Sequence, residues 1–315
     1  MLIFRAVTET KGMRMNRIIA ALFPVLVAAL TGCGAPAAKS AGGGTMVTDT
    51  SATVAAVLSD TLFTERMESL WADSDSLSTI FIRVDWPQGS DSLSRAVRSF
   101  VVSELASVCP PYGCLSDVPA DQYPAYTGNA DSARMLLDFY GQSALRYLNQ
   151  VQEEMRDEYR PEGVRLSSEV ALFKEAETER YVTCSVNAYY YLGGAHGSSY
   201  ARCVNLSKRS FRMLGYTVDT ARVADMQPLL RHGAVEYLTL CGEQVNDGNL
   251  LDYLFVADGM IPLPSQSPYL APDGVHFLYQ QYEIGPYALG MVGFTVPYAD
   301  IRPYLTPEAL ELLDD

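Results

Sequence analysis

The alternation of apolar and polar residues predicts one strand followed by two long helices in the first part of the chain. Residues 79–86 are β-branched and aromatic and stop at a proline, which is typical of a strand. Apolar residues then recur every three or four positions through residues 93–105, and again through residues 133–155. This spacing places each set on one side of a helix, and Asp131 or Ser132 can cap the second helix.

Farther along, the period changes to two. Residues 182–191 alternate between an apolar and a polar face, as a half-buried strand does. The glycine-rich stretch 193–199 interrupts this strand and residues 200–206 resume it, so we expect a β-hairpin. Cys184 lies on the apolar face whereas Cys203 falls among polar residues, so a disulfide between them would require a bulge.

The last third of the chain predicts a helix, two strands and a closing helix. The helix covers residues 233–240, and the strands cover residues 274–282 and 292–296, joined by residues 283–291. In the closing helix we expect Thr306 to be the N-cap and Pro307 the first helical residue. We expect Leu310 and Leu313 to form its buried side. Strands and helices that mix without strict alternation favour an α+β fold, with an antiparallel sheet, packed helices and two intimately associated α/β subdomains.

The N-terminal pattern predicts an export signal. Arg14 and Arg17 precede an apolar run at residues 18–30, which is shorter than the roughly 20 residues that span a bilayer. Residues 1–32 therefore read as a signal peptide. Leu-Thr-Gly before Cys33 resembles a lipobox, which predicts lipidation of Cys33; the alternative is an ordinary signal peptide followed by an incidental cysteine.

Residues 33–54 are small and nearly free of large apolar side chains, so we expect a flexible tether. Two or more acyl chains on Cys33 would hold the protein stably on a membrane. The sequence thus predicts an extracytoplasmic, membrane-anchored lipoprotein of the outer membrane or the cell surface.

The charge narrows the classes of partner. The chain carries a formal charge of −14, and removal of residues 1–32 leaves 19 basic and 36 acidic residues, a charge near −17. Such acidity disfavours nucleic acid and anionic lipid surfaces, and it would steer cationic proteins toward the chain. The alternative is that the acidity only keeps an exported domain in solution.

Five cysteines follow Cys33, and one pair predicts a disulfide. Cys109 and Cys114 flank a Pro-Pro-Tyr-Gly turn that brings them close, and an exported protein folds in an oxidising compartment. A C-x4-C pair without a nearby histidine is a weak zinc signal, so we expect no metal and no cofactor.

Separated segments in the second half of the chain carry a family resemblance. Residues 190–197 read Tyr-Tyr-Leu-Gly-Gly-Ala-His-Gly, and two further segments, residues 274–290 and 294–298, follow in the expected order. Together they resemble the C-terminal domain of the anti-sigma factor RsiV, which is domain of unknown function 3298. The preceding residues are similar, in the order of their elements, to domain of unknown function 4163, the accessory domain before the catalytic domain of the deacetylase PdaC.

The resemblance implies two domains and a binding role. It places the accessory-type α/β domain at residues 55–203 and the RsiV-like domain at residues 204–315. One turn departs from the family, since residues 205–210 read Asn-Leu-Ser-Lys-Arg-Ser. In RsiV this domain binds lysozyme, which implies a ligand-binding extracytoplasmic domain here; signalling through a sigma factor is not implied.

The sequence offers little support for an enzyme. The three histidines lack metalloprotease spacing, and neither a nucleophile elbow nor a phosphate-binding loop is present. His196 in the glycine-rich turn is expected to bond a backbone group and fix the turn. The remaining catalytic hypothesis is a peptidoglycan-acting envelope enzyme that uses Glu283 with Asp300 or His196.

The tyrosines point instead to binding. The chain has 20 tyrosines, and many lie near the two motif segments, where rigid aromatic rings suit a protein interface. Those on the apolar strand faces are expected in the core, whereas Tyr287 follows a proline in a turn and is expected to be exposed. The predicted contacts for a cationic partner such as lysozyme are His196, Tyr282, Glu283, Pro286 and Tyr287. A structural envelope component without a soluble ligand remains the third hypothesis.

Overall fold

The computed structural model describes residues 61–74, 77–111, 123–158 and 163–313. The predicted signal peptide and tether, the lipidation residue Cys33 and the candidate disulfide partner Cys114 lie outside these residues. In the part of the chain that is described, no helix is both long and apolar enough to span a membrane.

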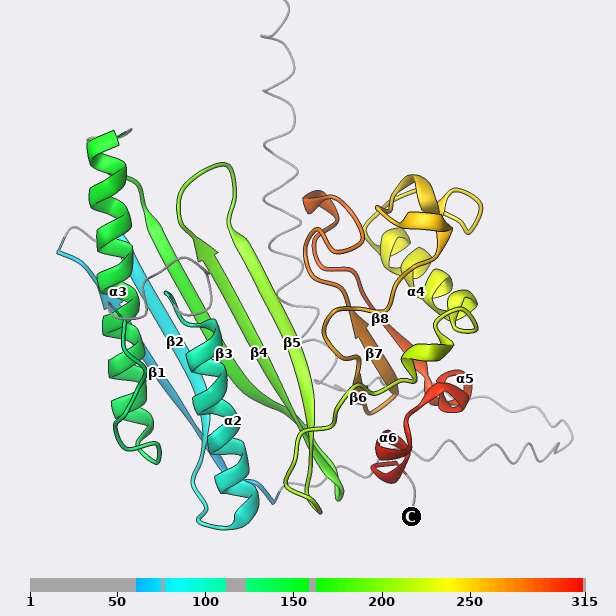
Figure 1. The fold of residues 1–315 in the computed structure, drawn as a ribbon, viewed down its shortest axis with the longest axis horizontal. Coiled ribbons are helices and arrows are strands. Elements are labelled where there is room, and N and C mark those ends of the chain that lie inside the picture. The colour runs from blue at the N-terminus through cyan, green and yellow to red at the C-terminus, as the bar shows by residue number, and fades with distance from the viewer. Residues whose placement is uncertain (1–60, 75–76, 112–122, 159–162, 314–315) are drawn as a thin grey trace, which may run out of the picture. The chain divides into compact units, whose positions relative to one another are not determined.

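The first half of the described chain forms a five-stranded sheet with the strand order β1-β2-β3-β4-β5 (Figure 1). All neighbouring strands are antiparallel except β2 and β3, which pair in parallel. The chain reaches β3 from β2 only after the helices α2 and α3, and a crossover of this length allows parallel pairing. The strands are β1 (Thr64–Ala72), β2 (Ser78–Pro87), β3 (Leu166–Glu177), β4 (Tyr181–Tyr191) and β5 (Ser198–Ser207).

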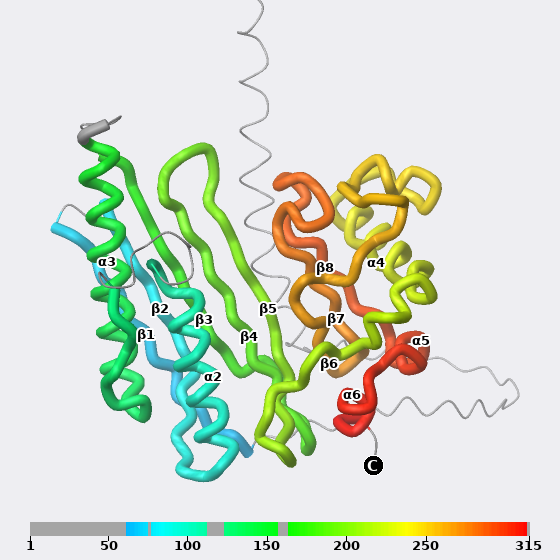
Figure 2. Tube along the Cα trace, in the orientation of Figure 1, coloured from blue at the N-terminus to red at the C-terminus, as the bar shows by residue number. Residues whose placement is uncertain are grey.

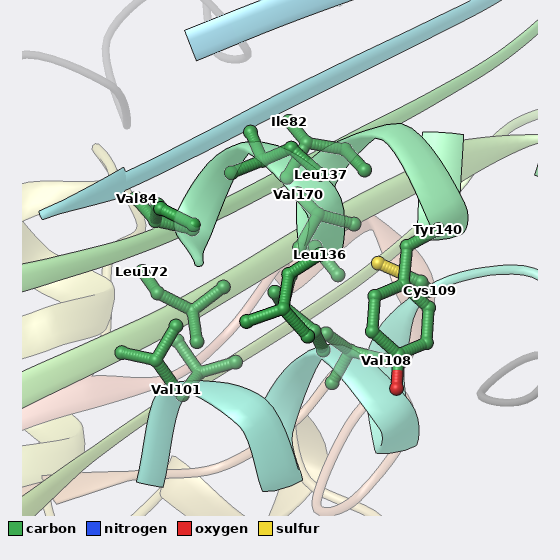
Figure 3. Packing of buried hydrophobic residues seen from close by; sticks show 14 of the residues in the cluster. Ile82, Val84, Val101, Val108, Cys109, Leu136, Leu137, Tyr140, Val170 and Leu172 are labelled. Atoms are coloured by element: carbon green, nitrogen blue, oxygen red, sulfur yellow. The ribbon is translucent and has the colours of Figure 1, made fainter. Parts of the chain in front are cut away.

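Helices α2 (Ser92–Val108) and α3 (Ala133–Glu158) pack on one face of this sheet and enclose the first core. Figure 3 shows Ile82 and Val84 of β2 and Val170 and Leu172 of β3 meeting the helical side chains. Those labelled from the helices and their ends are Val101, Val108, Cys109, Leu136, Leu137 and Tyr140. The expected helices at residues 93–105 and 133–155 are confirmed, because their apolar stripes cover this face.

The second half forms a three-stranded antiparallel sheet with the order β6-β7-β8, against which α4 packs (Figure 2). Its separate core includes Leu230 and Leu238 of α4 and Phe277 and Phe294 of the sheet. The elements are α4 (Gln227–Leu240), β6 (Tyr269–Ala271), β7 (Gly274–Leu278), β8 (Gly293–Pro297), α5 (Tyr298–Ile301) and α6 (Pro307–Glu311), with short 3-10 turns at Thr220–Arg222, Leu250–Asp252, Ala257–Gly259, Tyr287–Leu289 and Arg302–Tyr304. The two sheets with their helices confirm the α+β class.

Several local expectations change in detail. The strand expected at residues 274–282 ends at Leu278, because the chain turns through Tyr282, which has a φ of 66°. Thr306 caps α6 as expected, accepting from the Ala309 N–H at 3.3 Å. However, Ala309 is the fully buried residue of α6, and the expected Leu310 and Leu313 are only partly buried. A single helical turn cannot bury a wide side, which explains the difference.

The cysteines within the described residues are buried, except Cys241. Cys109 lies at the end of α2, beside a cis Pro110–Pro111 bond. Cys203 lies opposite Ser185 in an unbroken ladder, and no disulfide joins it to Cys184. The predicted domain boundary between residues 203 and 204 falls inside β5, since this strand continues to Ser207.

A buried carboxylate at the end of β3 fixes the start of the described chain. Glu177 accepts from the backbone N–H groups of Thr61 at 3.0 Å and Leu62 at 3.1 Å. It also pairs with Lys174 at 2.8 Å and Lys208 at 2.5 Å. Burial favours a higher pKa for Glu177, but these hydrogen bonds outweigh burial and lower its pKa to about 2.

Candidate functional site

Two loops from different sheets meet at one end of the molecule. One is the turn of the β4–β5 hairpin, residues 192–197, and the other is the segment 279–292 that joins β7 to β8. The expected hairpin is therefore confirmed, with Gly193 and Gly194 at φ values of 89° and 94° that favour glycine. Figure 2 shows the hairpin turn and the segment before β8 at the same end of the molecule.

The side chain of His196 connects the two loops. Its ring stacks on Tyr287 with the centroids 3.8 Å apart, and its Nε2 lies 3.2 Å from the Tyr282 hydroxyl. Its Nδ1 lies 2.9 Å from the Gly197 carbonyl oxygen. Because a carbonyl can only accept, Nδ1 carries the proton in the neutral ring, and Tyr282 then donates to Nε2. We call His196, Tyr282 and Tyr287 the aromatic triad.

The backbone carbonyl of Gly197 holds two members of the triad in place. This carbonyl accepts a second hydrogen bond, from the Tyr287 hydroxyl at 3.0 Å. A Cβ at position 197 would collide with the ring of Tyr189, so only glycine lets this ring and the hairpin turn approach so closely. His196 thus bonds a backbone group at the turn, as expected, and it also holds a tyrosine of the second loop.

The two tyrosines of the triad differ in exposure. Tyr282 is 56% exposed, whereas Tyr287, expected to be the exposed residue, is half-buried beneath the imidazole. The positive φ of Tyr282 turns its side chain outward, a backbone feature that the sequence pattern does not reveal. The accessible surface of the triad therefore consists of Tyr282 and His196.

The other two predicted contact residues shape the loop. The carboxylate of Glu283 accepts from the backbone N–H groups of Gln280, at 2.6 Å, and Ser265. Pro286 precedes the 3-10 turn at Tyr287–Leu289, and its carbonyl accepts from the Leu289 N–H at 2.9 Å. Both residues hold the loop that presents the triad.

Polar side chains that the sequence analysis did not single out join the two sheets. The Gln281 Oε1 accepts from the Ser199 N–H of β5 at 2.9 Å, and Gln280 exchanges two hydrogen bonds with Ala201. Farther along β5, the buried side chain of Asn205 both accepts from and donates to the backbone of Leu270 in β6. These side chains fix the position of the second loop relative to the hairpin.

The segment that precedes the second loop exposes apolar side chains and is rich in carboxylates. Phe255 is 64% exposed, Leu251 and Met260 are also exposed, and the Phe255 N–H donates to the Ile284 carbonyl at 2.8 Å. Residues 232–301 contain no lysine or arginine. Their eight carboxylates are Glu236, Glu243, Asp247, Asp252, Asp258, Asp273, Glu283 and Asp300.

The geometry gives no support to acid–base catalysis. Glu283 bonds two backbone N–H groups, and among the described residues no hydrogen bond or ion pair joins it to Asp300 or His196. Burial lowers the pKa of His276 to about 4, and its Nδ1 lies 3.0 Å from the Thr295 hydroxyl. Over the same residues, no group of three or more histidine, cysteine, aspartate or glutamate side chains could hold a metal ion.

Comparison with known proteins supports the expected family for the second half. Residues 237–299 match the family described as protein of unknown function DUF3298, so this segment is a DUF3298 domain. A crystal structure of a DUF3298 family member from Bacteroides fragilis is 18% identical, with a TM-score of 0.56, covering 81% of this chain and 96% of that one.

A DUF3298 family protein from Pseudomonas aeruginosa is 15% identical, with a TM-score of 0.50, covering 79% of this chain and 97% of that one. At these identities the likeness concerns the fold alone. No curated protein matches the chain.

Proposed function

We propose that this protein is a lipoprotein, anchored outside the cytoplasm through Cys33, that binds a cationic protein with the surface around the aromatic triad. The observation that carries the proposal is the triad itself. Two loops from separate sheets converge to hold Tyr282 more than half exposed, while a hydrogen bond to His196 and a ring contact with Tyr287 fix its position. Rigid, pre-organised aromatic rings bind protein surfaces at a low cost in conformational entropy.

The charge supports a cationic partner. Residues 232–301 carry eight carboxylates and no lysine or arginine, so this segment has an excess of negative charge even though Asp247 pairs with Arg231 at 2.5 Å. A field of one sign steers an oppositely charged protein and raises its association rate. Exposed Leu251, Phe255 and Met260 supply apolar area in the same segment.

We also propose that the second half of the chain is an RsiV-like domain and that the first half is a PdaC-type accessory domain. The resemblance of the motif segments to RsiV makes a lysozyme-type muramidase the first partner to test. On this proposal the accessory-type domain carries β5, whose hairpin turn supplies His196, and the RsiV-like domain supplies both tyrosines of the triad.

Isothermal titration calorimetry of the purified full-length protein with hen lysozyme tests the proposal. We expect binding that weakens as salt rises, and a loss of at least about tenfold in affinity for Tyr282→Ala, as for an interface anchor. Tyr304→Ala is the control, because Tyr304 stacks on Arg222 away from both loops. The absence of heat at low salt, or equal losses in the two variants, would contradict the proposed site.

A further inference from the structure

Within the described ranges, strand β1 forms an unpaired edge of the five-stranded sheet. The Gln88 N–H donates to the Phe63 carbonyl at 3.0 Å, and the Asp73 N–H donates to the Ser78 carbonyl at 3.2 Å. Both bonds continue the β1–β2 register, and hydrogen-bonded pairs alternate along an antiparallel ladder. Odd-numbered residues of β1 therefore bond β2, and the even-numbered residues from Thr64 to Ala72 direct their N–H and C=O groups outward.

The opposite edge of the sheet, at β5, is covered by the chain itself. Gln280 and Gln281 bond the outward groups of Ala201 and Ser199. Farther along, the Asn205 carbonyl accepts from the Leu214 N–H at 2.7 Å, and the Ser207 N–H donates to the Arg212 carbonyl. Among the described residues, β1 is paired with β2 alone.

Strand β1 also lacks most features that protect an edge from pairing. It is nine residues long, contains no proline, and keeps an unbroken register with β2. Leu70, on the face without helices, is 67% exposed. A long, regular edge with exposed apolar side chains is a template for another strand.

The charged side chains of β1 favour pairing with a second copy of β1 in one register. Arg66 and Glu68 both direct their backbone groups outward, and their side chains lie on the same face of the sheet. If a second β1 pairs antiparallel with this one around Met67, Arg66 of each copy lies opposite Glu68 of the other. Centring on Arg66 or on Glu68 would instead place like charges opposite each other. Thus the strand is complementary to itself in the Met67-centred register.

We infer that two copies of this chain associate through antiparallel β1–β1 pairing centred on Met67, which joins their sheets into one ten-stranded sheet. The outward groups of residues 64–70 form about eight backbone hydrogen bonds in this arrangement. Arg66 keeps its bidentate pair with Asp85, at 2.9 and 3.1 Å, because the guanidinium has donors for both carboxylates.

The helix layer is compatible with this dimer. Helix α3 packs on β1 and β2, where Gly141 lies against the ring of Trp71. The twofold axis stands perpendicular to the sheet, so both α3 helices lie on the same face. They are separated by about two strand spacings, roughly 10 Å, which is the packing distance of neighbouring helices.

Cysteine crosslinking of the full-length protein in cell membranes tests the register in a Cys241→Ser background. Met67→Cys places two thiols at a directly opposed, non-hydrogen-bonded pair with Cα atoms about 4.5 Å apart, within disulfide reach. We expect a dimer band after mild oxidation. Ser69→Cys is the matched control, because its twofold mate lies about 14 Å away along the strand and should not crosslink.

Sedimentation equilibrium at 0.15 M salt tests the charge pairing. Glu68→Lys opposes two cations across the interface and should raise the dimer dissociation constant about tenfold. Glu65→Lys is the control, because it makes the same charge change opposite the uncharged Ser69. It should leave the dimer dissociation constant within about twofold of the wild-type value.

A monomeric wild-type protein, or a dimer that crosslinks at residue 69 rather than 67, overturns the inference. Crosslinking of Met67→Cys to a different protein would assign the edge to another strand and would also overturn it. None of these results bears on the aromatic triad, since the inference does not rest on the proposed function.

Discussion

The side chain of Gln280 takes the place of a neighbouring strand for Ala201. Its Oε1 accepts from the Ala201 N–H at 3.1 Å, and its Nε2 donates to the Ala201 carbonyl at 2.7 Å. One amide thus satisfies both backbone groups of an edge residue. It also ties the loop that carries Tyr282 and Tyr287 to the strand that follows His196.

Gln280→Glu should destabilise the protein by about 2 kcal/mol, because a carboxylate cannot donate to the Ala201 carbonyl and repels it. Gln281→Glu is the matched control, since Gln281 is seen only to accept, from the Ser199 N–H, and a carboxylate still accepts. We expect this control to stay within about 0.5 kcal/mol of wild type. Urea unfolding followed by tryptophan fluorescence measures both, and equal losses would contradict the assigned role of the Gln280 amide.

Stability should fall in acid through Glu177. The pKa of its carboxyl is lower in the folded state than the usual value near 4.5, so folding is stabilised above that value. This stabilisation should be lost as the pH falls from about 4.5 to about 2. Glu177→Gln should cost about 3 kcal/mol at pH 7, because it removes the carboxylate that pairs with the partly buried Lys174 and Lys208, and the difference from wild type should shrink toward pH 2.

Urea titrations at several pH values measure this difference. Exposed Glu179, two residues along the chain, provides the control, and Glu179→Gln should show a small difference at every pH. A constant gap between wild type and Glu177→Gln over this range would contradict the lowered pKa.

Gly197→Ala should disrupt the aromatic triad, because the new methyl group collides with Tyr189 and displaces the carbonyl that His196 and Tyr287 share. We expect a loss of about 2 kcal/mol and a changed near-UV circular dichroism signal from the tyrosines. Gly194→Ala meets no neighbour within 4 Å but must adopt a φ of 94°. It should cost about 1 kcal/mol with the near-UV signal preserved. Loss of that signal in both variants would argue against the contact with Tyr189.

Cys33→Ser should abolish lipid attachment, because only a thiol forms the thioether of a lipoprotein. Metabolic labelling with a clickable fatty acid should mark the wild-type protein, and the variant should leave the membrane fraction. Cys241→Ser controls for the loss of a thiol and should remain labelled. Unlabelled wild-type protein would contradict the proposed anchoring.

Local periodicity was sufficient for several individual elements, but it did not predict strand β1, and it did not predict how the strands pair. The stripes of residues 93–105 and 133–155 and the alternation of residues 182–191 predicted two helices and the first strand of the hairpin, because each depends on burying one side. The parallel pairing of β2 with β3 was not predictable in this way, since it depends on where two helices send the chain.

At the candidate site, too, the sequence predicted which segments matter but not how their side chains are arranged. The predicted contact residues His196, Tyr282 and Tyr287 do come together, because the motif segments marked both loops. Their order of exposure was wrong, since the positive φ of Tyr282 has no signature in the sequence. Gln280, Gln281 and Asn205 read as ordinary strand or loop polar residues, and their function is visible only once the second sheet lies against β5.

The parallel junction between β2 and β3 divides the five-stranded sheet into two pieces that can each assemble early during folding. The β1–β2 hairpin and the β3–β4–β5 meander close only short loops, whereas their union must bring together segments on either side of residues 88–165. Closing so long a loop is the entropically expensive, late event on the folding route. Val84, whose partner Leu172 lies across the junction, should therefore give a lower Φ-value than Val186, which pairs with Leu172 within the meander.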